Sequence, residues 1–340
     1  MHAGKIAKGV FMNGIRGWTA AAALALAACG AVVIRAAEPE SGELEIVKLR
    51  PNFYMIAGAG ANIGVQVGID GVVLADAGSE GASDRVLAAL KKITDLPTRY
   101  IIDTGADADH VGGNGKLAKA GYTIFINPLG NSTFGNAMTN GGAAAILAHD
   151  SILRRMSAPT GKTAAFPVES WPTEAFLKPR WYVRMNDEPI EILYQSAAHS
   201  DADSFVFFRK SDVVAAGDVL DTTRFPIIDV AKGGSVQGEI DALNRLIDMA
   251  IPPGPLIYEG IGTYVIPGHG RPCEQLDVVE YRDMVVEVRD TIADMIKQGM
   301  TLDQIKAAHP ARPYETEYGT EEGSTSVFVD SVYKSLTAKK

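Results

Sequence analysis

One stretch organises this sequence: Asp103-Thr104-Gly105-Ala106-Asp107-Ala108-Asp109-His110-Val111-Gly112-Gly113-Asn114. It follows an apolar, β-branched run, Tyr100-Ile101-Ile102, which is typical of a buried strand. Three carboxylates and one imidazole then fall within eight residues. Carboxylate oxygen and imidazole nitrogen are ligands that zinc accepts, and a loop after a buried strand is a common position for a functional site. The stretch therefore predicts a site for a divalent metal ion.

The bulk composition bounds the class of protein. The chain has 340 residues, of which 46% are hydrophobic, so it can bury a large core. Its net charge of −9 argues against a nucleic-acid-binding surface. The two cysteines, Cys29 and Cys273, lie far apart in different contexts and indicate no disulfide framework.

The N-terminus has the pattern of an export signal. Basic residues precede an apolar run over residues 18–34, and the segment Arg35-Ala36-Ala37-Glu38 closes that run. The run is short for a membrane-spanning helix. We therefore predict that residues 1–37 are a cleaved signal peptide and that the mature protein is periplasmic.

A second interpretation of the same segment concerns Cys29. The residues Leu26-Ala27-Ala28-Cys29 resemble a bacterial lipobox, and cleavage there would leave Cys29 as a lipid anchor. The apolar residues Ala31-Val32-Val33-Ile34 continue past the cysteine, where lipoproteins usually become polar. This pattern favours cleavage near Ala36 or Ala37.

Three later loops carry the same kinds of ligand. They are His199-Ser200-Asp201-Ala202-Asp203, the pair Gly217-Asp218, and Pro267-Gly268-His269-Gly270. Each follows a run of apolar residues that predicts a strand. Loops at the ends of different strands can converge on one edge of a sheet, so we expect His199, Asp218 and His269 to lie near the first stretch.

The four loops resemble the metal-binding loops of the metallo-β-lactamase-fold hydrolases. The family signature is His-x-His-x-Asp-His followed by Gly-Gly-Asn, and Asp109, His110 and residues 112–114 match it. The first two histidines are replaced by Gly105 and Asp107. The resemblance implies an α+β fold, a four-layer αββα sandwich of two mixed β-sheets flanked by helices. It covers a single domain over residues 43–340, including the Asp76-Ala77-Gly78 turn found under the metal site in the family.

The resemblance also implies a set of ligands. Members of the family hold two metal ions side by side, and here the second site keeps its full set. Its ligands would be Asp109, His110 and His269, with Asp218 as the bridging carboxylate. The first site keeps only His199 and the bridge, with Asp107 as an additional oxygen. We therefore expect one tightly bound Zn²⁺, and a second ion that is weakly bound or absent.

The reaction that the resemblance implies is metal-assisted hydrolysis of a small-molecule substrate. Water would attack an ester, thioester, lactone or amide carbonyl, with β-lactams included. The catalytic residues would be Asp107, Asp109 and His199, of which Asp107 or His199 would orient the water or take its proton. Two alternatives are an iron-dependent redox member of the fold and a non-catalytic relative that binds a ligand or a partner protein.

Local patterns predict several elements and some purely structural roles. We expect a hairpin turn with positive φ at Asp70-Gly71, and a helix capped by Ser83. We also expect a strand over residues 122–126, a helix over residues 143–156 and a loop over residues 171–180. His149, within that helix, would be a core or capping residue. Other structural expectations are a turn cap at Asp103, turn-stabilising groups at Asp201 and Asp203, an inert Cys273, and close backbone approach at Gly112 and Gly113.

Overall fold

The computed structural model describes residues 42–123, 142–254, 262–320 and 323–338. The chain divides into two compact units, residues 1–36 and 37–340, and all of the described residues belong to the second. The predicted signal peptide and Cys29 lie outside the described residues, as does most of the strand expected over residues 122–126. The domain boundaries stay predictions.

A seven-stranded mixed sheet forms one half of the second unit. Its order is β1-β2-β3-β4-β5-β6-β9. Neighbours are antiparallel from β1 to β4 and parallel from β4 to β9. The strands are β1 (Glu45–Arg50), β2 (Phe53–Ala57), β3 (Ile63–Gly68), β4 (Gly71–Ala75), β5 (Thr98–Ile102), β6 (Ala145–His149) and β9 (Glu174–Phe176).

A five-stranded mixed sheet forms the other half. Its order is β10-β11-β12-β13-β14, antiparallel except for the last, parallel pair. The strands are β10 (Arg180–Met185), β11 (Glu188–Gln195), β12 (Asp203–Phe208), β13 (Val213–Asp221) and β14 (Tyr264–His269), and a separate small hairpin pairs β7 (Pro159–Thr160) with β8 (Thr163–Ala164).

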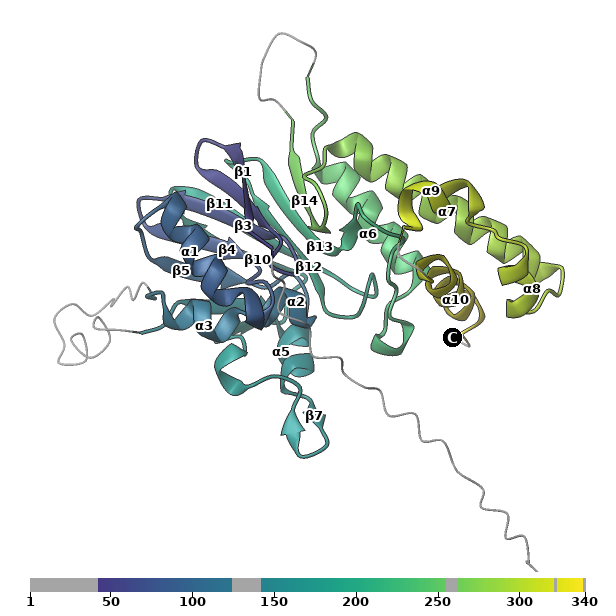
Figure 1. Ribbon diagram of the computed structural model, residues 1–340, viewed down its shortest axis with the longest axis horizontal. Coiled ribbons are helices and arrows are strands. Elements are labelled where there is room, and N and C mark those ends of the chain that lie inside the picture. The colour runs from purple at the N-terminus through teal and green to yellow at the C-terminus, as the bar shows by residue number, and fades with distance from the viewer. Residues whose placement is uncertain (1–41, 124–141, 255–261, 321–322, 339–340) are drawn as a thin grey trace, which may run out of the picture. The chain divides into compact units, whose positions relative to one another are not determined.

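Helices cover the outer faces of both sheets (Figure 1). Side chains from α1 and α3 pack on the seven-stranded sheet, and those from α6, α7 and α10 pack on the five-stranded sheet. The helices are α1 (Ser83–Ile93), α2 (Ala108–Val111), α3 (Asn114–Lys119), α5 (Asp150–Ser157), α6 (Val236–Met249), α7 (Gln275–Lys297), α8 (Leu302–Ala307), α9 (Glu315–Tyr318) and α10 (Ser324–Thr337), with short 3-10 turns at Glu80–Ala82, Val168–Ser170, Val230–Lys232 and Arg312–Tyr314. No helix in the described ranges has the length and apolar character needed to cross a bilayer.

The central core lies between the two sheets, and strand periodicity explains how it forms. In β12, Val206 and Phe208 face the other sheet, whereas Phe205 and Phe207 face the helices. Successive side chains of a strand point to opposite faces, so an unbroken apolar strand serves two cores at once. The predicted four-layer αββα sandwich of two mixed sheets is confirmed.

Four local predictions were wrong. Ser83 is the first residue of α1 and not its N-cap, which is Ala82. Residues 143–156 are not one helix but strand β6 followed by α5, because pairing with β5 and β9 outweighs the helix propensity of the alanines. The hairpin between β3 and β4 is present, but only Gly71 has positive φ, and the turn residues are Ile69 and Asp70. The expected loop over residues 171–180 contains β9 and the start of β10.

The strand ends position the candidate site. The strands β4 and β5 of one sheet, and β13 and β14 of the other, end at the same edge of the sandwich. Hydrogen bonds and ion pairs join the residues at or near these ends. The four loops singled out in the sequence therefore meet at one place.

Candidate metal centre

His110 is the most buried of the candidate ligands. It lies in the short helix α2 after β5, and its side chain has no exposed surface. Its Nδ1 lies 2.9 Å from Asp76 Oδ2, and Asp76 in turn accepts hydrogen bonds from the backbone N–H and the hydroxyl of Thr104. This chain of contacts fixes the ring so that Nε2 faces Asp218, at 3.1 Å from Oδ1.

The residues predicted to form the second metal site, called here the second half of the centre, lie close together in the structure. Coordinating atoms of Asp109, His110 and His269 all lie within 4.8 Å of one another. His269 Nε2 is 3.2 Å from Asp109 Oδ2 and 3.5 Å from Asp218 Oδ1. The Nε2 atoms of His110 and His269 are both buried and have no hydrogen-bond partner among the described residues.

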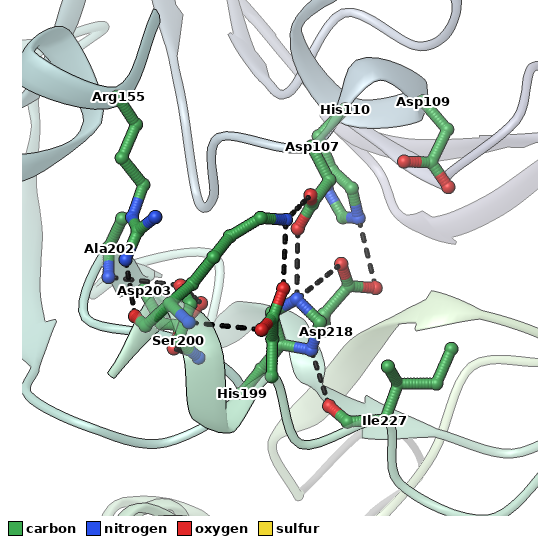
Figure 2. Close-up of polar contacts among 12 residues, drawn as sticks. Asp107, Asp109, His110, Arg155, His199, Ser200, Ala202, Asp203, Asp218 and Ile227 are labelled. Atoms are coloured by element: carbon green, nitrogen blue, oxygen red, sulfur yellow. Dashed lines mark hydrogen bonds and ion pairs between the residues drawn. The ribbon is translucent and has the colours of Figure 1, made fainter. Parts of the chain in front are cut away.

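The residues left at the predicted first metal site, called here the first half of the centre, also lie close together, but they provide fewer ligands. Atoms of Asp107, His199 and Asp218 lie within 4.8 Å of one another, and Figure 2 shows these side chains facing one another. His199 Nε2 is 2.9 Å from Asp107 Oδ2 and 3.9 Å from Asp218 Oδ2, while Nδ1 lies 2.5 Å from the carbonyl oxygen of Ile227. Gly105 brings no side chain, and a Cβ there would meet nothing within 4 Å.

One cation that the sequence analysis missed lies beside this half. Lys232 Nζ is 3.1 Å from Asp107 Oδ1 and 3.1 Å from Asp229 Oδ2. Lys232 follows Asp107 by 125 residues, and no spacing or motif in the sequence links the two. Only the tertiary structure reveals the pair.

The charged groups of the centre shift one another's pKa values. Burial lowers the pKa of His199, but the hydrogen bond to Asp107 and the charge of Asp218 outweigh it and raise the pKa to about 10. Burial raises the pKa of Asp107, but the hydrogen bond from His199 brings it down to about 2. Burial likewise lowers the pKa of His269, and the carboxylates of Asp109 and Asp218, 3.2 and 3.5 Å from Nε2, raise it to about 9. Metal binding requires neutral rings, so an ion would compete with these protons.

The two halves differ in how well they fit a metal ion. The second half offers two buried imidazole nitrogens without hydrogen bonds and the carboxylates of Asp109 and Asp218, a donor set that suits zinc. In the first half the Asp107 carboxylate is already paired on both oxygens, with His199 and with Lys232. The residues present therefore fit an ion better in the second half than in the first, where an ion would compete with Lys232 and with the contact between His199 and Asp107.

Several nearby residues prove to be supports. Asp103 is fully buried, and each of its carboxylate oxygens accepts from the Asn114 side-chain amide, so the predicted turn cap is wrong. Asp203 accepts a hydrogen bond from the Ser200 N–H next to His199, which agrees with the predicted turn-stabilising role. His149 caps α5 by accepting from the Ser151 N–H.

A four-layer αββα sandwich with histidines and carboxylates gathered at one edge defines a class of metal-binding hydrolase folds. The family model of the metallo-beta-lactamase superfamily matches residues 58–258 of this chain. The chain belongs to the metallo-beta-lactamase superfamily, and the resemblance seen in its sequence is confirmed.

Solved structures show the same fold at low identity. The stereoselective inverting sec-alkylsulfatase Pisa1 from Pseudomonas sp. matches with a TM-score of 0.57, 14% identity, and 86% of this chain covered. A double mutant of that sulfatase gives 0.59 and 15% identity at the same coverage. The chain spans 50% of the length of these sulfatase structures. A metallo-beta-lactamase from Pontibacter korlensis gives 0.50 and 14% identity, over 71% of this chain and 98% of that one. No curated protein gives a significant match.

Proposed function

We propose that this protein is a zinc-dependent hydrolase that works through the second half of the centre. The substrate would be a small molecule with an ester, thioester, lactone or amide carbonyl, β-lactams included. One observation carries the proposal: two buried imidazole nitrogens converge on the same Asp218 oxygen, with Asp109 beside them, and neither nitrogen makes a hydrogen bond of good geometry. Such atoms are costly to bury unless something binds them, and a metal ion satisfies both.

The chain's own residues would hold and orient the ion. Asp109, His110, His269 and Asp218 would be its ligands, and zinc would supply Lewis acidity toward water and toward the carbonyl. The carboxylate of Asp76 keeps the His110 ring in place from the side away from the ion. A hydrogen-bonded carboxylate behind a ligating histidine also raises the ring's affinity for metal.

The roles of Asp107 and His199 follow from their pairing. A carboxylate whose pKa is about 2 is a weak proton acceptor at neutral pH, so Asp107 is poorly suited as a general base. The pair lies beside Asp218, where it would orient water or substrate next to the ion. We therefore assign Asp107 and His199 to positioning, and Asp109 to holding the ion at which the chemistry occurs.

The second candidate is a non-catalytic binding protein. It is favoured by the replacement of both leading histidines. Gly105 offers no side-chain ligand, and the carboxylate of Asp107 is paired with His199 and Lys232. Metal content separates the two candidates, because the binding protein needs no ion. Iron in place of zinc would instead support the redox alternative.

The test combines metal analysis with turnover. The protein is stripped with a chelator, loaded with zinc, freed of excess and analysed for zinc per chain. Hydrolysis of a lactone, a thioester, a chromogenic β-lactam and a secondary alkyl sulfate is then measured; the sulfate is included because of the sulfatase fold match. We expect one zinc per chain and turnover of at least one substrate class.

His110→Ala is the decisive variant, and His309→Ala is its control. His309 lies two residues after the end of α8, and its side chain is 63% exposed. We expect His110→Ala to lose zinc and to lower turnover at least about 100-fold, and His309→Ala to change neither. Turnover that does not respond to His110→Ala would remove the assignment, and a zinc-free wild type would favour the binding protein.

We also propose that the protein is exported. The support is the basic and apolar N-terminal pattern, and the test is the intact mass of the protein recovered from a bacterial periplasm and membrane fraction. Cleavage near Ala36 or Ala37 predicts a soluble mature chain, and Cys29→Ala should not change it. If Cys29→Ala instead releases the protein from membranes, Cys29 is the lipid anchor.

A further inference from the structure

The observation that carries this inference is the position of Lys232. Its ammonium bridges two carboxylates, 3.1 Å from Asp107 Oδ1 and 3.1 Å from Asp229 Oδ2. Both carboxylate oxygens of Asp107 therefore have a partner, because the other oxygen lies 2.9 Å from His199 Nε2. The lysine side chain is 44% exposed, so its head group lies at the rim of the first half of the centre and not in its interior.

The segment that carries Lys232 is held firmly against the His199 loop. The carbonyl oxygen of Ile227 accepts from His199 Nδ1, and the His199 carbonyl accepts from the Asp229 N–H at 2.8 Å. The Lys232 carbonyl accepts from the Asp201 N–H at 2.9 Å. One segment, residues 227–232, therefore both orients His199 and delivers a cation to the carboxylate that His199 contacts.

A second metal ion would meet three obstacles in this half. It would have to displace Lys232 from Asp107, remove the contact between His199 and Asp107, and manage without a ligand at Gly105. A divalent ion close to an ammonium also experiences strong repulsion, which desolvation at a partly buried site increases. The ammonium, in contrast, neutralises Asp107 without needing any of these changes.

We propose that Lys232 takes the place of the second cation beside Asp107 and restricts the centre to a single metal ion. The inference rests on the proposed function, since it assumes an ion in the second half. It assigns Lys232 a positioning and selectivity role. Asp107 stands where the family has a histidine. The ammonium of Lys232 explains how the negative charge of this carboxylate is neutralised without a second metal ion.

The test is metal stoichiometry in charge-neutral and charge-retaining variants of the full chain. Lys232→Met and Lys232→Gln remove the ammonium, and Lys232→Arg keeps a cation. Lys116→Met is the matched control, because Lys116 also pairs with an aspartate, Asp84, and is 50% exposed. Zinc and cobalt(II) are titrated against a competing chelator, with zinc per chain and the cobalt absorption spectrum as readouts, and circular dichroism confirms that each variant folds.

We expect one ion for the wild type, Lys232→Arg and Lys116→Met. For Lys232→Met and Lys232→Gln we expect a second ion that binds at least about tenfold more tightly than in the wild type. Adding Gly105→His to Lys232→Met supplies the missing ligand and should tighten the second ion further. The same Gly105→His substitution with Lys232 intact should have a smaller effect.

Two results would overturn the role of Lys232 while leaving the proposed function in place. One is a wild type that already binds two ions, and the other is a second-ion affinity that is unchanged in both neutral variants. A wild type that binds no zinc or cobalt would instead contradict the proposed function itself, and the role of Lys232 with it.

Discussion

Single side chains decide whether His110 can serve as a ligand. Its ring is fixed by Asp76, which is 2% exposed and has a φ of 66°. Aspartate and asparagine tolerate this left-handed conformation better than most residues. Asp76 is therefore suited both to the tight turn after β4 and to the hydrogen bond that orients the ring.

Asp76→Asn should weaken zinc binding about 10- to 100-fold with little loss of fold stability. Asparagine keeps the shape and tolerates the φ, but it replaces the charged acceptor of His110 Nδ1 and Thr104 Oγ1 by a neutral amide. Competition with a chelator measures the affinity. The control is Asp95→Asn, an exposed position at the opposite end of β5. Equal zinc affinity in Asp76→Asn and wild type would show that His110 needs no carboxylate behind it.

Cys273 should be inert in the folded protein. It is 1% exposed, and burial raises the pKa of its thiol to about 12. At pH 8 only about one thiol in ten thousand would be ionised. In a Cys29→Ala background, a disulfide reagent should label Cys273 in urea and leave it unlabelled in buffer. Rapid labelling of the native protein would contradict the burial of this side chain.

The site residues differ in how far the sequence could predict them. Asp109, His110 and the tail Gly112-Gly113-Asn114 belong to one local motif, which is why their proximity could be predicted. Lys232 could not, because its pairing with Asp107 depends on a turn 125 residues further along the chain. Asp103 was misassigned because its partner, Asn114, lies in the motif's tail and not in the following turn.

Among the elements, helix α2 is positioned by its contact with the turn after β4. The N–H of Ala77 donates to the His110 carbonyl, and the N–H of Gly113 donates to the Gly78 carbonyl, both at 2.8 Å. Gly113 has helical φ, so the glycine is needed for close approach and not for an unusual conformation. A Cβ on it would lie 2.3 Å from the Ala77 carbonyl oxygen.

Gly113→Ala should therefore destabilise the fold and displace His110. The added methyl group meets backbone that cannot rotate away, so we expect a loss of about 1–3 kcal/mol in unfolding free energy, together with weaker zinc binding. Urea denaturation provides the measurement. Gly81→Ala is the control, because a Cβ there would meet nothing within 4 Å. Equal losses in the two variants would exclude close approach as the cause.

Helix α6 carries a buried acid that the mechanism does not use. Both oxygens of Glu239 are buried without a hydrogen-bond partner among the described residues. Burial raises the pKa of Glu239 well above 4.5, and the charges of Asp203 and Asp218 add to the effect while that of His199 opposes it. The folded state thus favours the neutral acid, and Glu239 destabilises the fold increasingly as the pH rises above 4.5.

Glu239→Gln should stabilise the metal-free protein at pH 8 but not at pH 4. The difference should grow with pH by up to about 1.4 kcal/mol per unit, until the folded-state pKa is reached. Urea denaturation at several pH values, with the exposed Glu80→Gln as control, checks this. A stability difference that stays constant from pH 4 to pH 8 would mean that Glu239 is ionised in the folded protein.

Element prediction failed where pairing and local propensity disagree. The run Ala143-Ala144-Ala145-Ile146-Leu147-Ala148 is rich in helix-forming residues, yet β6 starts within it at Ala145, because β5 and β9 pair with this strand on its two sides. Strand β10 (Arg180–Met185) was missed because most of its residues are exposed and its apolar alternation is weak. Strands such as β5 and β12 were predictable because their apolar runs are buried on both faces.

At the scale of the whole described unit, the proposed ion would join the two sheets. Asp109 and His110 follow β5 of the seven-stranded sheet, whereas Asp218 and His269 lie on β13 and β14 of the five-stranded sheet. The core between the sheets is already apolar and continuous. An ion bound by residues from both halves would therefore bind the assembled sandwich and not the separated strands.

Zinc should accordingly raise the thermal stability of the whole unit. A ligand that binds only the folded state stabilises it by about 2.7 kcal/mol at a concentration 100 times its dissociation constant. For a unit of this size that corresponds to an increase of roughly 3–5 °C in Tm. Calorimetry of chelator-treated protein with and without zinc measures the shift, which His110→Ala should abolish and His309→Ala should retain. Among the candidate ligands, His110 alone has a fully buried ring, which lies between Asp76 and Asp218. A shift of the same size in His110→Ala would therefore mean that zinc binds elsewhere.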